Sequence, residues 1–201
     1  MSAEKKKKIV VLLGHPDKEG TLTASLADAY EQGAREAGHE VRRINVGDLQ
    51  FDPNLRRGYK VIQKLEPDLK RVQEDIAWCD HLVVLYPNWW SSMPAILKGL
   101  FDRMWLPGYS FKYYKEGLRH RLHLWKRMMA DKTARVIVTS GAHPFFIWLF
   151  VGDYTNEIAR GVLWFVGFEV DTTCLGPSEN LSEAKKQRWL EKMRRMGARA
   201  S

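Results

Sequence analysis

One segment near the start of the chain, Gly14–Thr23, places polar side chains at the start of an amphipathic stretch. It reads GHPDKEGTLT and offers the imidazole of His15 and the hydroxyls of Thr21 and Thr23. If a helix follows, its free N-terminal N–H groups and the positive end of its dipole favour a bound phosphate. The glycine spacing of dinucleotide-binding and P-loop sequences is absent. An ordinary strand-to-helix turn with a threonine cap would have the same sequence, so both interpretations stay open at this point.

A second segment, Tyr86–Pro94, is rich in aromatic residues. It reads YPNWWSSMP, and its adjacent Trp89 and Trp90 cannot both face the same core. A flat redox ring such as a flavin requires flat walls and backbone N–H donors, and an aromatic loop supplies both. The alternative is that one tryptophan packs in the core and the other in a subunit interface.

The third segment, Thr139–Phe146, reads TSGAHPFF. Gly141 permits a ligand to approach the backbone closely. The N–H groups of Gly141 and Ala142 could donate to the pyrimidine oxygens of a flavin and stabilise charge that develops there on reduction. His143 is a candidate proton donor, although a histidine in a loop is often incidental.

The elements around these segments alternate between short apolar runs and longer amphipathic stretches, which is typical of βαβ units around a parallel sheet. The predicted strands are Ile9–Leu13, Glu40–Val46, His81–Tyr86, Ala134–Thr139 and Glu169–Leu175. The predicted helices are Thr21–Ala37, Asp68–Trp78, Pro94–Trp105, Asp153–Val166 and Ser182–Met196. The long, aromatic and basic segment 106–132 receives no assignment.

This pattern predicts a doubly wound α/β fold with a five-stranded parallel sheet and helices on both faces. Two strand orders are common for such sheets, and in both the ligand binds outside the carboxyl ends of the strands. All three segments above follow predicted strands. We expect one domain over residues 1–201, with residues 1–7 forming a flexible basic tail.

The composition is that of an ordinary globular protein, with 45% hydrophobic residues and a formal charge of +8. No apolar run approaches the ~18 to 20 residues needed to span a bilayer or resembles a secretory segment. We therefore expect a cytoplasmic protein without an integral membrane segment.

Cys79 and Cys174 lack metal-ligand and CxxC spacing, so we predict buried thiols and no metal site. The basic residues are scattered along the chain, so the positive charge is best explained as an ordinary solvated surface. A surface that attracts an anionic cofactor such as NADPH is the second interpretation, and nucleic-acid binding is the third.

The run Tyr86–Trp105, YPNWWSSMPAILKGLFDRMW, closely resembles a pattern of the NAD(P)H:quinone oxidoreductase family, which has a flavodoxin-like fold. The residues that fit the family pattern are Pro87, Trp90, Pro94, Ala95, Leu97, Lys98, Gly99, Asp102 and Arg103. Gly14–Pro16, Thr139–Ala142 and Trp164–Phe168 resemble further family segments, so the similarity extends over roughly residues 8–176.

The resemblance implies a homodimer that holds FAD or FMN non-covalently at its interface. NAD(P)H would give a hydride to flavin N5 and leave, and a quinone or similar flat acceptor would then take two electrons. By position, the flavin-binding residues would be His15, Thr21, Leu22, Thr23, Pro87, Asn88, Trp89, Trp90, Ser91, Thr139, Ser140, Gly141 and Ala142. FMN and FAD, like NADH and NADPH, are equally compatible with the resemblance.

Two departures from the family pattern concern catalysis and charge. Apolar Phe145–Trp148 follows the third segment, where vertebrate family members have a Tyr and a His that assist hydride transfer. His143 and Tyr154 are the candidates for that role here. The basic stretch 118–132 has no family role, whereas the aromatic residues before it are candidates to line the nicotinamide or quinone site: Tyr109, Phe111, Tyr113 and Tyr114.

The resemblance leaves a second function open, since some family members are ancillary regulatory flavoprotein subunits of potassium efflux antiporters. A one-electron flavodoxin-type carrier is less favoured, because such proteins are usually acidic and this chain is basic.

Overall fold

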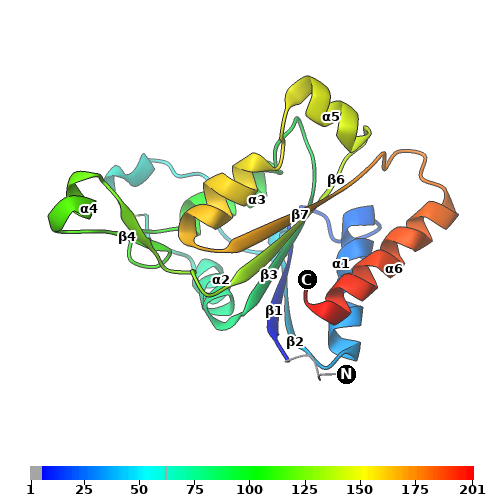
Figure 1. Ribbon diagram of the computed structural model, residues 1–201, viewed down its shortest axis with the longest axis horizontal. Coiled ribbons are helices and arrows are strands. Elements are labelled where there is room, and N and C mark those ends of the chain that lie inside the picture. Colours follow the sequence, from blue (N-terminus) through cyan, green and yellow to red (C-terminus); the bar gives the residue numbers. More distant parts are fainter. Residues whose placement is uncertain (1–5, 62) are drawn as a thin grey trace.

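The computed structural model describes residues 6–61 and 63–201, and five parallel strands form its central sheet (Figure 1). The strands are β1 (Lys8–Leu13), β2 (Glu40–Asn45), β3 (His81–Pro87), β6 (Thr133–Thr139) and β7 (Glu169–Leu175). Their order across the sheet is β2-β1-β3-β6-β7. Of the two strand orders that the sequence left open, this is the order found in flavodoxin-like folds. The predicted fold class and all five predicted strands are confirmed.

The sheet is buried on both faces, which explains why its central strands read as continuous apolar runs. In β1, Val10 and Leu12 face a layer formed by α2 (Pro67–Trp78), α3 (Ala95–Met104) and the π-helix η3 (Glu157–Trp164). Ile9, Val11 and Leu13 face the opposite layer, formed by α1 (Leu22–Glu36) and α6 (Glu183–Arg199). Figure 1 shows α1 and α6 side by side on one side of the sheet.

Helices α1 and α6 approach each other closely because glycines stand at their crossing. A Cβ added to Gly33 would lie 2.0 Å from the backbone oxygen of Arg194, and one added to Gly197 would lie 2.0 Å from that of Tyr30. Arg194 also forms an ion pair with Glu36 at 2.8 Å. The C-terminal helix is thereby held against the first helix.

The helix ends follow the capping residues that the sequence shows. Thr21 caps α1, and Gly38 follows that helix with a left-handed φ of 85°, which costs glycine little. Pro67 is the first residue of α2, and Ser182 caps α6. These ends depend on local chemistry, which is why the sequence indicates them.

Three parts of the structure differ from the elements that the sequence predicts. The unassigned segment folds into a two-stranded antiparallel ribbon of β4 (Phe111–Tyr113) and β5 (Trp125–Arg127), connected through the short helix α4 (Gly117–Arg121). Residues 144–146, predicted as loop, begin a helix, α5 (Pro144–Val151). The helix predicted over 153–166 contains π-helical η3 in its middle, and residues 153–155 lie outside it.

The remaining short elements are the single 3-10 turns η1 (Val46–Asp48) and η2 (Gly58–Lys60). Residues 1–5 of the expected basic tail lie outside the described residues, whereas Lys7 donates its backbone N–H to His39 and its Nζ to the oxygen of Ala200. Within residues 6–61 and 63–201, no helix combines the length and the apolar character that crossing a membrane requires.

Candidate functional site

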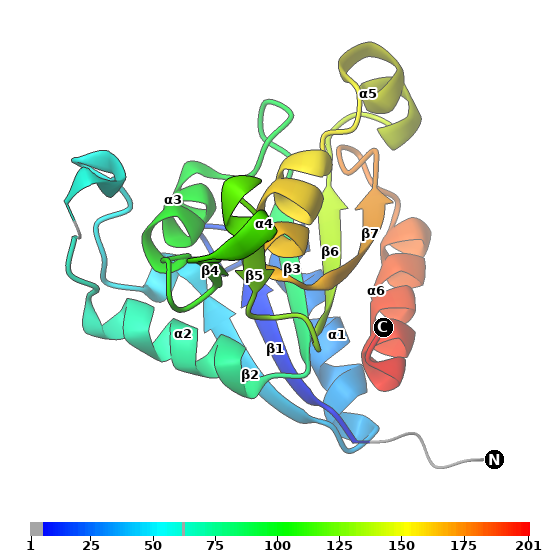
Figure 2. The same cartoon turned by 60° about the vertical axis from the view of Figure 1, so that its left-hand side comes forward.

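The three segments that follow β1, β3 and β6 meet at one edge of the sheet, where Figure 2 shows the strands ending below α5. Asn88 donates its backbone N–H to the oxygen of Thr139 at 2.7 Å, which joins the second segment to the third. The hydroxyls of Thr23 and Thr139 lie 3.1 Å apart, which joins α1 to the third segment. The rings of His15 and Trp89 meet edge to face at 5.6 Å. The parallel arrangement thus gathers all three segments.

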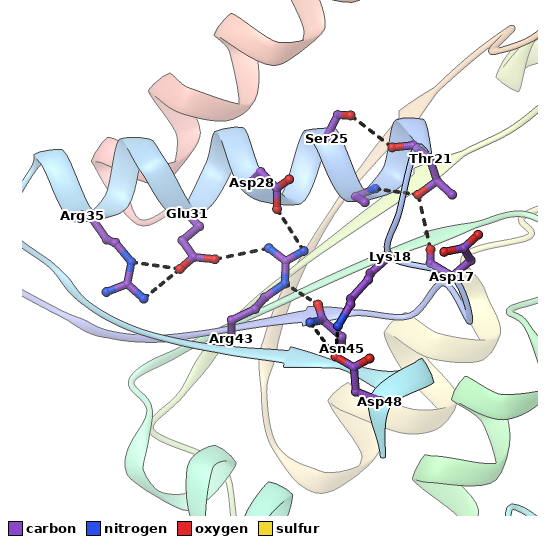
Figure 3. Close-up of polar contacts among 11 residues, drawn as sticks. Asp17, Lys18, Thr21, Ser25, Asp28, Glu31, Arg35, Arg43, Asn45 and Asp48 are labelled. Carbon is purple, nitrogen blue, oxygen red and sulfur yellow. Dashed lines mark hydrogen bonds and ion pairs between the residues drawn. The ribbon is translucent and has the colours of Figure 1, made fainter. Parts of the chain in front are cut away.

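The first segment is held in a fixed shape by its own polar groups (Figure 3). The Thr21 hydroxyl accepts from the N–H of Ala24 at 3.2 Å, so this side chain caps α1. Lys18 forms an ion pair with Asp48 at 2.9 Å, which fastens the segment to η1. A Cβ on Gly47 would lie 1.9 Å from the oxygen of Pro16, so the segment lies directly against that turn.

Helix α1 is in turn fixed to the sheet beside this segment. Arg43 of β2 reaches Asp28 at 3.2 Å and Glu31 at 3.3 Å, both on α1 (Figure 3). Because Thr21 is committed to the cap and Thr23 to Thr139, their hydroxyls serve the scaffold. The groups left for a phosphate are the first two N–H groups of α1, those of Leu22 and Thr23, and Nε2 of His15, because Nδ1 of that ring accepts from the N–H of Asp17 at 2.9 Å.

The second segment turns tightly at its aromatic pair. Trp89 and Ser92 exchange two backbone hydrogen bonds, of 3.0 and 3.1 Å, across Trp90 and Ser91. Both intervening residues have left-handed backbones, with φ of 53° and 61°. Such a pair without glycine is strained, and strained turns concentrate at functional sites.

Neither tryptophan of this segment lies in the core. Trp89 is 45% exposed and Trp90 is 100% exposed. The interpretation that places one of them in the core is therefore wrong. The Ser92 hydroxyl donates to Glu157 at 2.5 Å, which fastens the turn to η3.

The third segment combines a buried anchor with exposed backbone. Ser140 is buried, donates its hydroxyl to the oxygen of Ala142 at 2.8 Å, and accepts from the N–H and hydroxyl of Ser178. Gly141 and Ala142 are exposed beyond this anchor. A Cβ on Gly141 would lie 2.9 Å from Oε1 of Glu179, so a larger residue would have to displace that side chain.

The two candidate proton donors have different surroundings. His143 is exposed and caps α5, since its Nδ1 accepts from the N–H of Phe145 at 3.2 Å. Tyr154 is buried, and in the part of the chain that the structure describes its hydroxyl has no hydrogen-bond partner, although Cys174 and Ser140 lie near it. Burial raises the pKa of Tyr154 above its ordinary value, so the phenol stays protonated and can donate at neutral pH.

An aromatic cavity of about 540 Å³ adjoins these loops between α3, η3 and the β4–β5 ribbon. Phe111 and Tyr113, two of the four aromatic residues expected at an acceptor site, line it. Tyr109 instead donates its hydroxyl to the oxygen of Gln73 at 2.6 Å, and Tyr114 lines a separate cavity. Glu157 lines the aromatic cavity and also binds Ser92, so the cavity and the second segment are neighbours.

Several residues of this cavity were not expected from the sequence: Tyr59, Trp105, Glu157 and Phe165. They come from four separate stretches of the chain, and nothing in the spacing of these residues indicates a shared cavity. The indole Nε1 of Trp105 is buried and has no hydrogen-bond partner among the described residues.

The run that resembles the quinone oxidoreductases also builds the wall of the cavity. A Cβ on Gly99 of α3 would lie 2.6 Å from the oxygen of Pro53, so Gly99 lets the segment 52–66 lie against the helix. Arg103, one turn later, is 1% exposed and binds Glu66 at 2.7 Å together with the backbone oxygens of Asp52 and Lys64. The segment held in this way carries Tyr59 to the cavity.

Comparisons with known proteins agree with this architecture. Residues 7–198 match a family described as having the flavodoxin-like fold. The chain is 31% identical over 174 residues to the uncharacterized NAD(P)H oxidoreductase YcaK of Escherichia coli (strain K12), covering 84% of this chain and 83% of that protein.

Solved structures show the same fold. The NAD(P)H:quinone oxidoreductase from Methanothermobacter marburgensis superposes with a TM-score of 0.79 at 24% identity, over 98% of this chain and all of that one. An FMN-dependent NADH-azoreductase from Bacillus anthracis str. Ames Ancestor, solved in complex with FMN, has a TM-score of 0.69 at 15% identity, over 95% and 97% of the two chains. The chain belongs to the flavodoxin-like NAD(P)H:quinone oxidoreductase family.

Proposed function

We propose that this protein is a flavin-dependent oxidoreductase that uses NAD(P)H to reduce quinones or similar flat acceptors. The observation that carries the proposal is the meeting of three loops at the carboxyl edge of β1, β3 and β6, with unpartnered polar atoms beside them. In doubly wound sheets this edge is where ligands bind.

The residues at this edge fit a flavin. Two buried polar atoms there lack partners among the described residues, the side-chain oxygen of Asn88 and the hydroxyl of Tyr154. Unpaired buried polar atoms are rare in proteins and call for a partner. A flavin ring carries both donors and acceptors on its edge, and its phosphate matches the N-terminus of α1.

Each loop then has a distinct part in holding the cofactor. His15 and the first amides of α1 would bind the phosphate, while Trp89 and the turn at Trp90 would contact the ring. Gly141 and Ala142 would donate to its pyrimidine edge. When bound, a flavin supplies the redox chemistry, taking a hydride from NAD(P)H and passing two electrons to the acceptor. Tyr154, protonated at neutral pH, would donate a hydrogen bond to the ring.

The aromatic cavity suits a flat acceptor, because its walls include Phe111, Tyr113 and Phe165. Phe111 and Phe165 meet edge to face at 5.3 Å. Aromatic walls of this kind bind planar rings through stacking and apolar contact. The relatives support this class of acceptor, since one matching structure is named a quinone oxidoreductase and another an azoreductase.

The direct test is a visible spectrum of the purified protein followed by addition of NADPH or NADH with menadione. We expect a bound or reconstitutable flavin, bleaching by the nucleotide, and reoxidation by the quinone. A colourless protein that takes up neither FMN nor FAD, and oxidises neither nucleotide, would reject the proposal.

Trp90→Ala should weaken flavin binding roughly 3- to 10-fold, the loss expected for one aromatic contact. The measurement is the dissociation constant of FMN and FAD for the apoprotein, followed by flavin fluorescence. Trp78→Ala, at the opposite edge of the sheet beside Arg42, is the matched control. Equal flavin affinity in the two variants would remove Trp90 from the site.

We also propose that the protein is a homodimer whose interface covers α5. Helix α5 has no charged residue, and six of its side chains are at least half exposed: Phe145, Phe146, Trp148, Leu149, Phe150 and Val151. Apolar surface of this extent on a monomer marks an interaction site. A second copy is the commonest occupant, and a two-fold dimer needs only one self-complementary patch.

Phe150→Asp, which places a charge on the most exposed side chain of α5, should convert the dimer to monomer. Light scattering coupled to size-exclusion chromatography would measure this. Leu118→Asp on α4, at a similarly exposed position, should leave the dimer intact. A wild-type protein that is monomeric at every accessible concentration would contradict the proposal.

A further inference from the structure

The β4–β5 ribbon and its connecting helix carry an unusual density of positive charge. Between residues 111 and 127 there is one acidic residue, Glu116, against six cations: Lys112, Lys115, Arg119, Arg121, Lys126 and Arg127. In the part of the chain that the structure describes, none of the six forms an ion pair. Arg119 lies over the ring of Tyr114 and Arg127 over that of Trp164.

The pairing of β4 with β5 brings two of these positive charges close together, which is electrostatically unfavourable. Lys112 stands directly opposite Lys126 in the antiparallel register. Like charges at directly opposed positions destabilise a strand pair. A bound anion between or beside them would remove that repulsion.

The ribbon nevertheless has a defined position, because its other face is anchored to η3. The Trp125 ring stacks on Phe165 with centroids 4.3 Å apart, and its Nε1 donates to the oxygen of Phe165 at 2.8 Å. Figure 1 shows the ribbon on the side of the sheet away from α1 and α6. The ribbon is therefore fixed beside the aromatic cavity, which its residues Phe111 and Tyr113 line.

A second cavity, of about 790 Å³, opens on the ribbon. Its lining includes Lys112, Lys115, His120, His123 and Tyr114. Pro107 and Tyr113 line both this cavity and the aromatic one, so the two are neighbours. Several aromatic rings line the first cavity, whereas the second places two lysines and two histidines among apolar residues.

We propose that this cationic cavity binds the phosphate groups of a phosphorylated nucleotide, the adenosine end of NADPH, while the nicotinamide end lies toward the aromatic cavity. The inference rests on the proposed function, since it names the donor of that reaction. A nucleotide suits the geometry because it joins a flat ring to a separate anionic end. An extended nucleic acid would need a basic surface that continues beyond one hollow.

The test uses the flavin-loaded protein with adenosine 2′,5′-bisphosphate as the probe and calorimetry as the readout. We expect the bisphosphate to bind and adenosine alone to bind far more weakly. In the double variant Lys112→Gln/Lys115→Gln, its affinity should fall roughly 5- to 10-fold, because two charge-assisted contacts are lost. The KM for NADPH should rise in parallel, with little change in kcat.

Lys70→Gln/Lys192→Gln removes the same charge from exposed positions on α2 and α6 and is the matched control. Equal affinity of the two double variants for the bisphosphate would overturn the inference. So would failure to bind the bisphosphate together with tight, steeply salt-dependent binding of a single-stranded oligonucleotide.

The two proposals fail in different ways. Ribbon-dependent binding of the bisphosphate in a protein that oxidises neither nucleotide would leave the phosphate site standing and reject the proposed reaction. If the protein reduces quinones with NADPH and the variant Lys112→Gln/Lys115→Gln has the wild-type KM for NADPH, the proposed reaction is supported and the phosphate site is rejected.

Discussion

Arg103→Met should lower the free energy of unfolding by about 3 kcal/mol, the lower end of the cost of breaking a buried ion pair on one side, because the Glu66 carboxylate is 27% exposed. The guanidinium of Arg103 is buried and makes two contacts with the Glu66 carboxylate, at 2.7 and 3.2 Å. It also satisfies the backbone oxygens of Asp52 and Lys64. A methionine fills similar volume but leaves the carboxylate and both carbonyls without these donors.

Urea unfolding followed by circular dichroism measures this loss. Arg56→Met is the matched control, because Arg56 also pairs with a carboxylate, that of Asp52 at 2.6 Å, but is 71% exposed. An exposed pair contributes little, so the control should unfold close to the wild type. If both variants lose the same stability, the buried position of Arg103 is not what anchors the segment 52–66.

Acid should destabilise the protein through His81, at the start of β3. Burial lowers the pKa of His81 from its ordinary value to about 3, and the positive charges of Lys7, Arg135 and His39 act in the same direction. Its Nδ1 lies 2.7 Å from the hydroxyl of Thr133, and its Nε2 is buried with no partner in residues 6–61 and 63–201. The folded protein therefore keeps this imidazole neutral.

The sign of the effect follows from where the proton binds. At a pH between about 3 and the ordinary value near 6.5, the unfolded chain binds a proton at His81 and the folded chain does not. Stability thus rises with pH across this window and is lost as pH falls. Between about pH 7 and about pH 5, His81 alone should account for a loss of about 2 kcal/mol.

His81→Asn keeps a group that can accept from Thr133 and removes the titration. The difference between variant and wild type in unfolding free energy, measured by urea at both pH values, isolates this one residue. His123→Asn, at an exposed site on the ribbon, should keep the wild-type slope. An unchanged slope in His81→Asn would show that other groups cause the acid sensitivity.

The sequence by itself determined the order of the main strands and helices. Ile9–Leu13 and His81–Tyr86 are apolar runs because both faces of a parallel sheet are covered. Thr21, Pro67 and Ser182 mark helix starts because each acts within its own turn. The edge where the loops meet also followed from the sequence, since parallel strands end together. All of these depend on residues close together in the chain or on a rule of parallel sheets.

The tertiary structure alone decided what depends on residues far apart. The ribbon strands are three residues each, and contacts with Phe165 and Trp164 fix their position. Strands this short do not produce a hydrophobic periodicity that the sequence of residues 106–132 could show. Helix α5 is apolar all round and exposed, so its sequence lacks the amphipathic stripe that indicates a helix. The aromatic cavity gathers side chains from the segment 52–66, from α3, from the ribbon and from η3. The spacing of residues along the chain does not predict which of them line the same cavity, because packing energy depends on contacts in space.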